Sequence, residues 1–148
     1  MIYDLPDLQA TEALAKQIAS KLQAGDALLL SGPLGAGKTA FSRALLRSVC
    51  GDAEMEVPSP SFTLVQIYES PKFPLYHYDL WRLEGADDLI ELGWDEAREG
   101  VVIVEWPERL GDLTLLDALT IQFSLKNDEN RQVILKGWED RLEPNFGK

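Results

Sequence analysis

The feature that most constrains this chain is the octapeptide GPLGAGKT, which runs from Gly32 to Thr39. It matches the phosphate-binding loop pattern G-x-x-x-x-G-K-[ST] at every fixed position. The apolar run Ala27–Leu30 precedes it and predicts a buried strand. Apolar residues at helical spacing follow it as far as Cys50. Strand, glycine-rich loop and helix, in this order, are the structural context that such a loop requires.

The chemistry of the motif depends on its backbone and on two side chains. The glycines let successive N–H groups turn toward phosphate oxygens, and the start of the helix adds a partial positive charge. Lys38 is expected to reach the β- and γ-phosphates, and the Thr39 hydroxyl to ligate Mg²⁺. A glycine-rich turn without a ligand is the weaker interpretation. The sequence therefore predicts a nucleoside triphosphate site.

Size and composition indicate one globular domain, residues 1–148, with 45% hydrophobic and 26% charged residues. No repeat, linker or low-complexity stretch divides it. Fourteen basic residues against 25 acidic ones give a formal charge of −11. Surfaces that grip nucleic acid cluster Lys and Arg, so tight direct binding of RNA or DNA is disfavoured. Solubility explains the acidic balance as well as an acidic docking face does.

The expected location is the cytoplasm, without a membrane anchor. No apolar run approaches the roughly 20 residues of a membrane-spanning helix. The first residues carry acids where a signal peptide would carry basic residues. Cys50 is the single cysteine, which excludes an internal disulfide, and we interpret it as a buried residue at a helix end.

The periodicity of apolar residues indicates an α/β chain. The short connection at residues 70–74 favours an antiparallel hairpin, and the run Val101–Val104, apolar on both faces, predicts a central strand. Residues after Trp138 are expected to be irregular. The pattern predicts helices at 7–24, after the loop as far as Cys50, and at 86–92, a turn at 95–99, and strands at 27–30, 63–68, 75–79, 101–104, 118–125 and 132–135.

Two carboxylates stand at strand ends, where a phosphate loop needs an acid for its metal. Glu105 directly follows the central run, and we predict that it is the metal-side acid rather than a solvated one. Asp79 ends another strand and has two interpretations: a base or outer metal group, or a cap of the turn at 80–82. His77 shares a face with Asp79, and we interpret it as a packed core or surface histidine.

A proline-stiffened loop follows the first helical unit. Its hydroxyl residues Ser59, Ser61 and Thr63 suit a switch that moves over the γ-phosphate, although such a loop is more often a simple connection. Trp106, beside Glu105, either stacks on a ligand or partner or only packs.

Four blocks in this order resemble the TsaE (YjeE) family of small bacterial ATPases. They are GPLGAGKT at 32–39, SPSFT at 59–63, HYDLWR at 77–82 and VEWPE at 104–108. The departures are small: Ser61 stands for a usual threonine, Trp81 for a tyrosine and Ala40 for a second threonine. None removes a group that the phosphate or metal chemistry needs.

The resemblance implies a single three-layer phosphate-loop α/β domain with a mixed parallel and antiparallel sheet, in agreement with the expected hairpin. It implies binding and hydrolysis of ATP with Mg²⁺, in support of threonylcarbamoyl modification of the tRNA adenosine next to the anticodon. The partners would be the proteins of the threonylcarbamoyl-transfer complex, with tRNA engaged only indirectly.

The resemblance also implies roles for individual residues. Thr39 and Glu105 would ligate magnesium, Lys38 would contact the phosphates, Asp79 would act in catalysis, and the loop of Ser59, Ser61 and Thr63 would be the switch. The base would lie near the amino-terminal segment Leu8–Thr11, with Arg131 a further contact. The implied nucleotide contacts are Leu8, Gly32, Leu34, Gly35, Ala36, Gly37, Lys38, Thr39, Ala40 and Arg131.

Two other functions share the loop. A small-molecule kinase would need an arginine-bearing lid, whereas the arginines after Arg82 are isolated and little chain remains for a lid. The interpretation as a GTP-driven switch has less support, because the chain contains neither D-x-x-G nor N-K-x-D.

Overall fold

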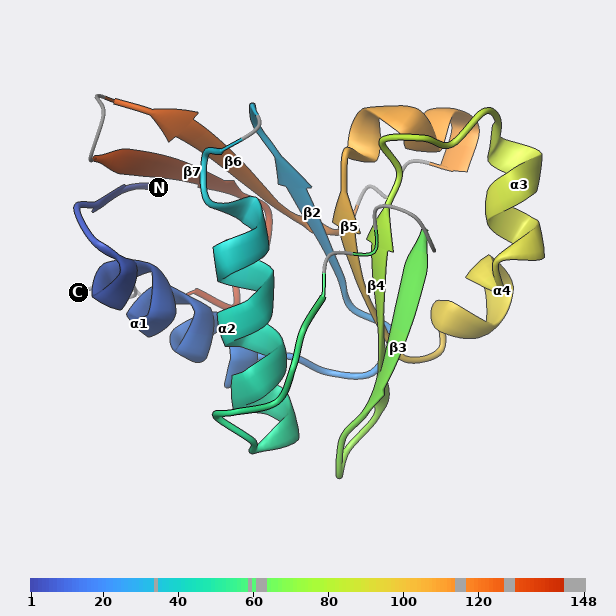
Figure 1. Cartoon of the computed structure of the whole chain (residues 1–148), viewed down its shortest axis with the longest axis horizontal. Coiled ribbons are helices and arrows are strands. Elements are labelled where there is room, and N and C mark those ends of the chain that lie inside the picture. The colour runs from blue at the N-terminus through green and yellow to red at the C-terminus, as the bar shows by residue number, and fades with distance from the viewer. Residues whose placement is uncertain (34, 59, 61–63, 114–116, 127–129, 143–148) are drawn as a thin grey trace.

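The computed structural model describes residues 1–33, 35–58, 60, 64–113, 117–126 and 130–142 (Figure 1). Its centre is a seven-stranded sheet with the order β1-β7-β6-β2-β5-β4-β3. The elements are β1 (Ile2–Leu5), α1 (Leu8–Ala19), β2 (Ala27–Ser31), α2 (Lys38–Cys50), β3 (Val65–Glu69), β4 (Pro74–Asp79), α3 (Ala86–Glu91), α4 (Trp94–Ala97), β5 (Val101–Glu105), the 3₁₀ helix η1 (Pro107–Leu113), β6 (Leu119–Leu125) and β7 (Arg131–Lys136).

The sheet mixes parallel and antiparallel pairs, which confirms the predicted fold class. β2 runs parallel to β5 and β6, and β4 runs parallel to β5. The β3–β4 pair is antiparallel, as the short connection predicted. The β6–β7 and β1–β7 pairs are also antiparallel. Every residue of β5 is buried, as expected of a strand covered on both faces.

Strand β1 is absent from the sequence-based prediction. It has four residues and lies at the edge of the sheet, where Ile2 is exposed and only Leu5 is buried. So short a segment has no apolar alternation that would reveal it. Its place is set by pairing with β7, in which Ile2 stands opposite Ile134.

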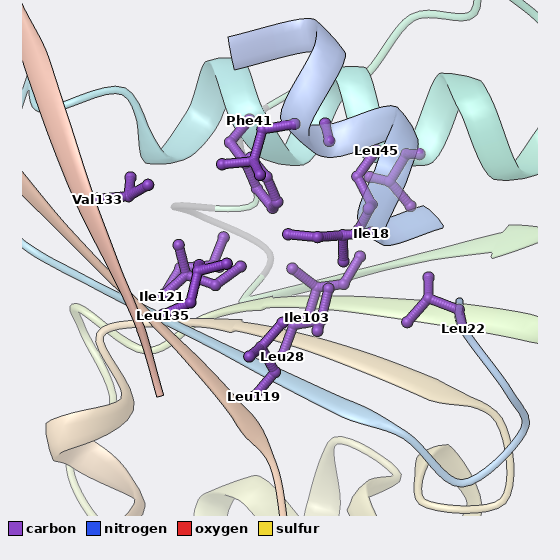
Figure 2. Close-up of a cluster of buried hydrophobic side chains, with 14 of the residues drawn as sticks. Ile18, Leu22, Leu28, Phe41, Leu45, Ile103, Leu119, Ile121, Val133 and Leu135 are labelled. Carbon is purple, nitrogen blue, oxygen red and sulfur yellow. The ribbon is translucent and has the colours of Figure 1, made fainter. Parts of the chain in front are cut away.

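Alternating side chains of the strands build two cores, one on each face of the sheet. Leu28 and Leu30 of β2 face α1 and α2, whereas Leu29 faces α3, α4 and η1. Figure 2 shows the first core, in which Phe41 and Leu45 of α2 point toward the sheet. The result is a sheet between two helical layers (Figure 1).

Helix α1 begins where the sequence predicts and ends earlier. Asp7 is its N-cap, and its Oδ1 accepts a hydrogen bond from the Ala10 N–H at 2.8 Å. The predicted end at residue 24 is wrong, because the helix ends at Ala19. The Ser20 hydroxyl donates to the Gln17 carbonyl at 2.6 Å, and the chain turns there. Leu22 nevertheless reaches the core, which explains the apparent continuation of the helical pattern.

Helix α2 ends at Cys50, as predicted, because Gly51 adopts a left-handed conformation with φ 70°. Cys50 itself is half-buried. Within the described residues of the tail, the chain forms a turn anchored by Arg141, which pairs with Asp26 at 2.8 Å and lies 3.8 Å over the Trp138 ring. In the described part of the chain, no helix is both long and apolar enough to cross a membrane.

Candidate nucleotide-binding site

Three parallel strands end at the same edge of the sheet and bring the predicted acids to the glycine-rich loop. Glu105, the last residue of β5, is paired with Leu30 of β2 on one side and with Asp79 of β4 on the other. The loop leaves β2 directly after Ser31. Both carboxylates therefore stand beside the start of the loop, as their places at strand ends led us to expect.

The loop has the backbone conformation that its glycines permit. Gly32, Gly35 and Gly37 have positive φ angles of 134°, 80° and 107°. Position 32 requires glycine for a second reason as well, because a Cβ atom there would collide with the Phe123 carbonyl of β6. Leu34, a predicted nucleotide contact, lies outside the described residues.

The start of α2 has the properties of an anion site. Its N-cap is Gly37, and among the described residues no side chain caps the helix. The first N–H groups of a helix have no partner within the helix and carry its positive partial charge. Thr39 and Ala40 belong to this first turn, and Ala36 is fully buried just before it. A phosphate group satisfies such a helix end well.

Lys38 is a buried cation next to the two strand-end acids. It is 5% exposed, and its Nζ donates to the Gly32 carbonyl at 2.6 Å and lies 3.5 Å from the Trp106 ring centroid. Burial lowers the pKa of Lys38, while the carboxylates of Glu105, Glu108 and Asp79 act in the opposite direction.

Glu105 forms a buried pair that the sequence interpretation did not anticipate. His77 is fully buried, and its Nε2 lies 2.6 Å from Oε2 of Glu105. The sequence predicts a packed core or surface histidine at this position. It belongs to the core, but its bond goes to the predicted metal-side acid. The available signal was its position two residues before Asp79, which places it on the same face of β4.

Asp79 makes the contact that its structural interpretation requires. It is 6% exposed, and its Oδ1 accepts from the Trp81 N–H at 3.1 Å, which caps the turn after β4. Trp81 in turn packs on Trp106, with ring centroids 4.4 Å apart. Trp106 has a φ of 62°, a strained value for a bulky residue. A catalytic role of Asp79 stays a prediction.

The other predicted contacts fall into separate places. Leu8 and Ala40 line the same cavity between α1 and α2, with a volume of about 430 Å³. Arg131 is not part of that lining: its Nε donates to the Gly35 carbonyl at 3.2 Å, so it contacts the loop. The predicted switch residues Ser59, Ser61 and Thr63 lie outside the described residues.

The donor set fits magnesium bound together with a nucleotide rather than a metal held by protein alone. Within the described ranges, no three His, Cys, Asp or Glu side chains form a group that could hold a metal. Mg²⁺ is commonly held by one or two protein oxygens, phosphate oxygens and water. A hydroxyl from Thr39 and a carboxylate from Glu105 suit that arrangement.

A mixed sheet with helices on both faces, and a glycine-rich loop between the central strand and the following helix, define a P-loop-like α/β protein. The sequence profile described as "Threonylcarbamoyl adenosine biosynthesis protein TsaE" matches residues 5–133. The chain therefore belongs to the TsaE family.

Individual relatives agree with this assignment. A "tRNA threonylcarbamoyladenosine biosynthesis protein TsaE" from Rickettsia prowazekii is 35% identical over 88% of this chain and 90% of its own length. The Bacillus subtilis protein of the same description is 34% identical over 91% and 84%. The crystal structure of Bacillus subtilis YdiB superposes with a TM-score of 0.77 at 29% identity, covering 95% of this chain and 87% of that one.

Proposed function

We propose that this chain is a magnesium-dependent ATPase of the cytoplasm that serves the biosynthesis of threonylcarbamoyladenosine in tRNA. The names of its relatives from R. prowazekii and B. subtilis support the pathway. The observation that carries the ATPase is the position of one buried cation, Lys38, at the start of α2, where Glu105 and Asp79 end two neighbouring parallel strands.

Each group at this edge has a defined task in the proposal. The N–H groups at the start of α2 and the Lys38 ammonium bind the triphosphate. Thr39 and Glu105 would hold Mg²⁺, which would supply neutralisation of the charge that develops on the phosphates. Asp79 accepts a proton from, or orients, the attacking water. The cavity that contains Leu8 and Ala40 receives the nucleoside.

The proposed partners are the proteins of the threonylcarbamoyl-transfer complex, and tRNA is reached only through them. The formal charge of −11 supports this choice, because tight direct binding of tRNA uses clustered basic residues. ATP turnover would then act on the complex, and the transfer chemistry would take place elsewhere.

The central test is calorimetric titration of ATP into the purified chain, with and without Mg²⁺. We expect saturable binding that Mg²⁺ strengthens and that Lys38→Ala abolishes. Lys72→Ala, a matched loss of charge in the exposed β3–β4 turn, should bind as the parent does. Absence of saturable ATP binding by the parent protein would overturn the proposal.

The partner is tested by capture of the transfer proteins on immobilised chain, with and without ATP. We expect capture that depends on nucleotide and a change in ATP turnover once the complex is added. Equal capture and unchanged turnover in all conditions would remove the regulatory part and leave only an ATPase.

A further inference from the structure

His77 occupies a place in the sheet that its polarity makes unfavourable. It lies within β4, next to the edge strand β3, with Gln66 of β3 and Ile103 of β5 as its register partners, and it is fully buried. It shares its face with Leu75, two residues earlier, which belongs to the core under α1 and α2. An apolar side chain would fill this place without burying ring nitrogens.

The imidazole has one polar attachment in the described structure, and that attachment is Glu105. A carboxylate only accepts hydrogen bonds, so Nε2 carries the proton in the 2.6 Å contact with Oε2. The other ring nitrogen, Nδ1, is buried and has no hydrogen-bond partner among the described residues. The position thus buries one unsatisfied polar atom and gains a single bond to the acid.

The register explains why this bond fixes the acid's orientation. Asp79 is the partner of Glu105, and His77 is the partner of Ile103, two residues before Glu105. The histidine therefore approaches diagonally from inside the core and holds Oε2, which leaves Oε1 for another ligand. Without that contact, the carboxylate at the end of β5 could turn about its terminal torsion.

We propose that His77 is a positioning residue that orients the Glu105 carboxylate toward the metal of a bound magnesium nucleotide. The inference rests on the proposed function, since it takes Glu105 as the metal-side acid. Hydrogen-bond partners of ligating carboxylates orient them, and their loss commonly weakens metal binding by about 10–100-fold. Metal-free nucleotide binding uses the loop and Lys38 and should not depend on His77.

Two amide substitutions of different length test the role of Nε2. In His77→Gln the amide nitrogen lies near the place of Nε2 and can donate to Glu105, whereas in His77→Asn it lies near Nδ1 and cannot. His77→Leu also offers no hydrogen bond to Glu105 and suits the apolar surroundings. Binding of Mn²⁺ is followed by electron paramagnetic resonance at saturating non-hydrolysable ATP analogue. Nucleotide affinity without metal and the melting temperature are measured alongside.

The expected result is a rise of about 10–100-fold in the Mn²⁺ dissociation constant for the Asn and Leu variants, with recovery in the Gln variant and unchanged metal-free nucleotide affinity. Parental Mn²⁺ affinity in the Asn and Leu variants overturns the inference. So does equal weakening in all three variants, which would indicate a packing role. Failure of the parent protein to hold Mn²⁺ with nucleotide would instead overturn the proposed function.

Discussion

Asp79 and Glu105 are register partners at the ends of β4 and β5, and each receives a hydrogen bond from a different donor. The Trp81 N–H donates to Asp79, and the His77 ring donates to Glu105. One acid is thus held by the turn that follows its strand, and the other by a side chain in the core. Two neighbouring carboxylates with different surroundings can take different chemical roles.

The two interpretations of Asp79 can be separated by Asp79→Asn and Asp79→Ala. The Asn variant keeps an oxygen that can accept from Trp81 and loses the charge, so we expect parental ATP affinity and stability with turnover reduced by about 100-fold or more. The Ala variant also loses the cap and about 1 kcal/mol of stability. ATP turnover, calorimetry and denaturant unfolding provide the measurements. Parental turnover in the Asn variant would leave Asp79 with the capping role only.

Gly32→Ala should damage the loop more than a glycine substitution that introduces conformational strain alone. A Cβ at position 32 collides with the Phe123 backbone, whereas at Gly25, with φ 94°, it meets no atom within 4 Å. Gly25→Ala should therefore lose only about 1–2 kcal/mol, the usual strain of a left-handed residue. We expect a larger loss in urea unfolding for Gly32→Ala, together with lost ATP binding. Equal losses of unfolding free energy in the two variants would show that the Phe123 backbone shifts to accommodate the added Cβ at little cost.

Trp106 should report nucleotide binding through its fluorescence, because its ring covers the Lys38 ammonium at 3.5 Å. We expect ATP with Mg²⁺ to change the intrinsic emission, since Lys38 must turn toward phosphate. Trp106→Phe should remove most of that change. Trp138→Phe should retain it, because Trp138 lies beside Asp117 at the start of β6, away from the strand ends that meet the loop. A response that survives Trp106→Phe would mean that Lys38 stays under the ring.

Tyr78 should make the fold sensitive to alkaline pH. Burial raises the pKa of its phenol above the ordinary value of 10.0, and its hydroxyl donates to the Leu92 carbonyl at 3.1 Å. Because the folded pKa is raised, the stability is intact below pH 10 and falls as the pH rises beyond it.

Near neutral pH, the Tyr78→Phe variant should be less stable than the parent by about 1 kcal/mol, because the substitution removes the hydrogen bond. The difference should shrink above pH 10, because Phe has no proton to lose. Burial also raises the pKa values of Tyr3 and Tyr68. The stability of the Phe variant should therefore still fall above pH 10, but less steeply than the stability of the parent. Denaturant unfolding across this range provides the measurement, and a constant difference at every pH would contradict the expectation.

Local patterns predicted most of the fold. The loop motif, the end of the following helix at Cys50 and the short β3–β4 connection each have one strong physical solution. The sequence-based prediction was wrong where contacts between distant parts of the chain determine the structure. β1 forms because β7 offers a free edge, and α1 ends at Ala19 although Leu22 continues the apolar pattern.

The candidate site divides in the same way. The positions of Glu105 and Asp79 followed from their places at strand ends. The bond between His77 and Glu105 depends on the relative register of β4 and β5, which no local pattern specifies. The contact of Arg131 with Gly35 links residues 96 positions apart and depends on the whole sheet.

The glycine-rich loop contacts the last hairpin of the sheet, formed by β6 and β7. Gly32 lies against the Phe123 backbone of β6, and Arg131 at the start of β7 donates to the Gly35 carbonyl. If the chain binds ATP as proposed, substitutions in this hairpin should therefore alter its affinity without contacting the ligand. We therefore expect substitutions in the carboxyl-terminal third to be tolerated less well than its distance in sequence from Lys38 suggests.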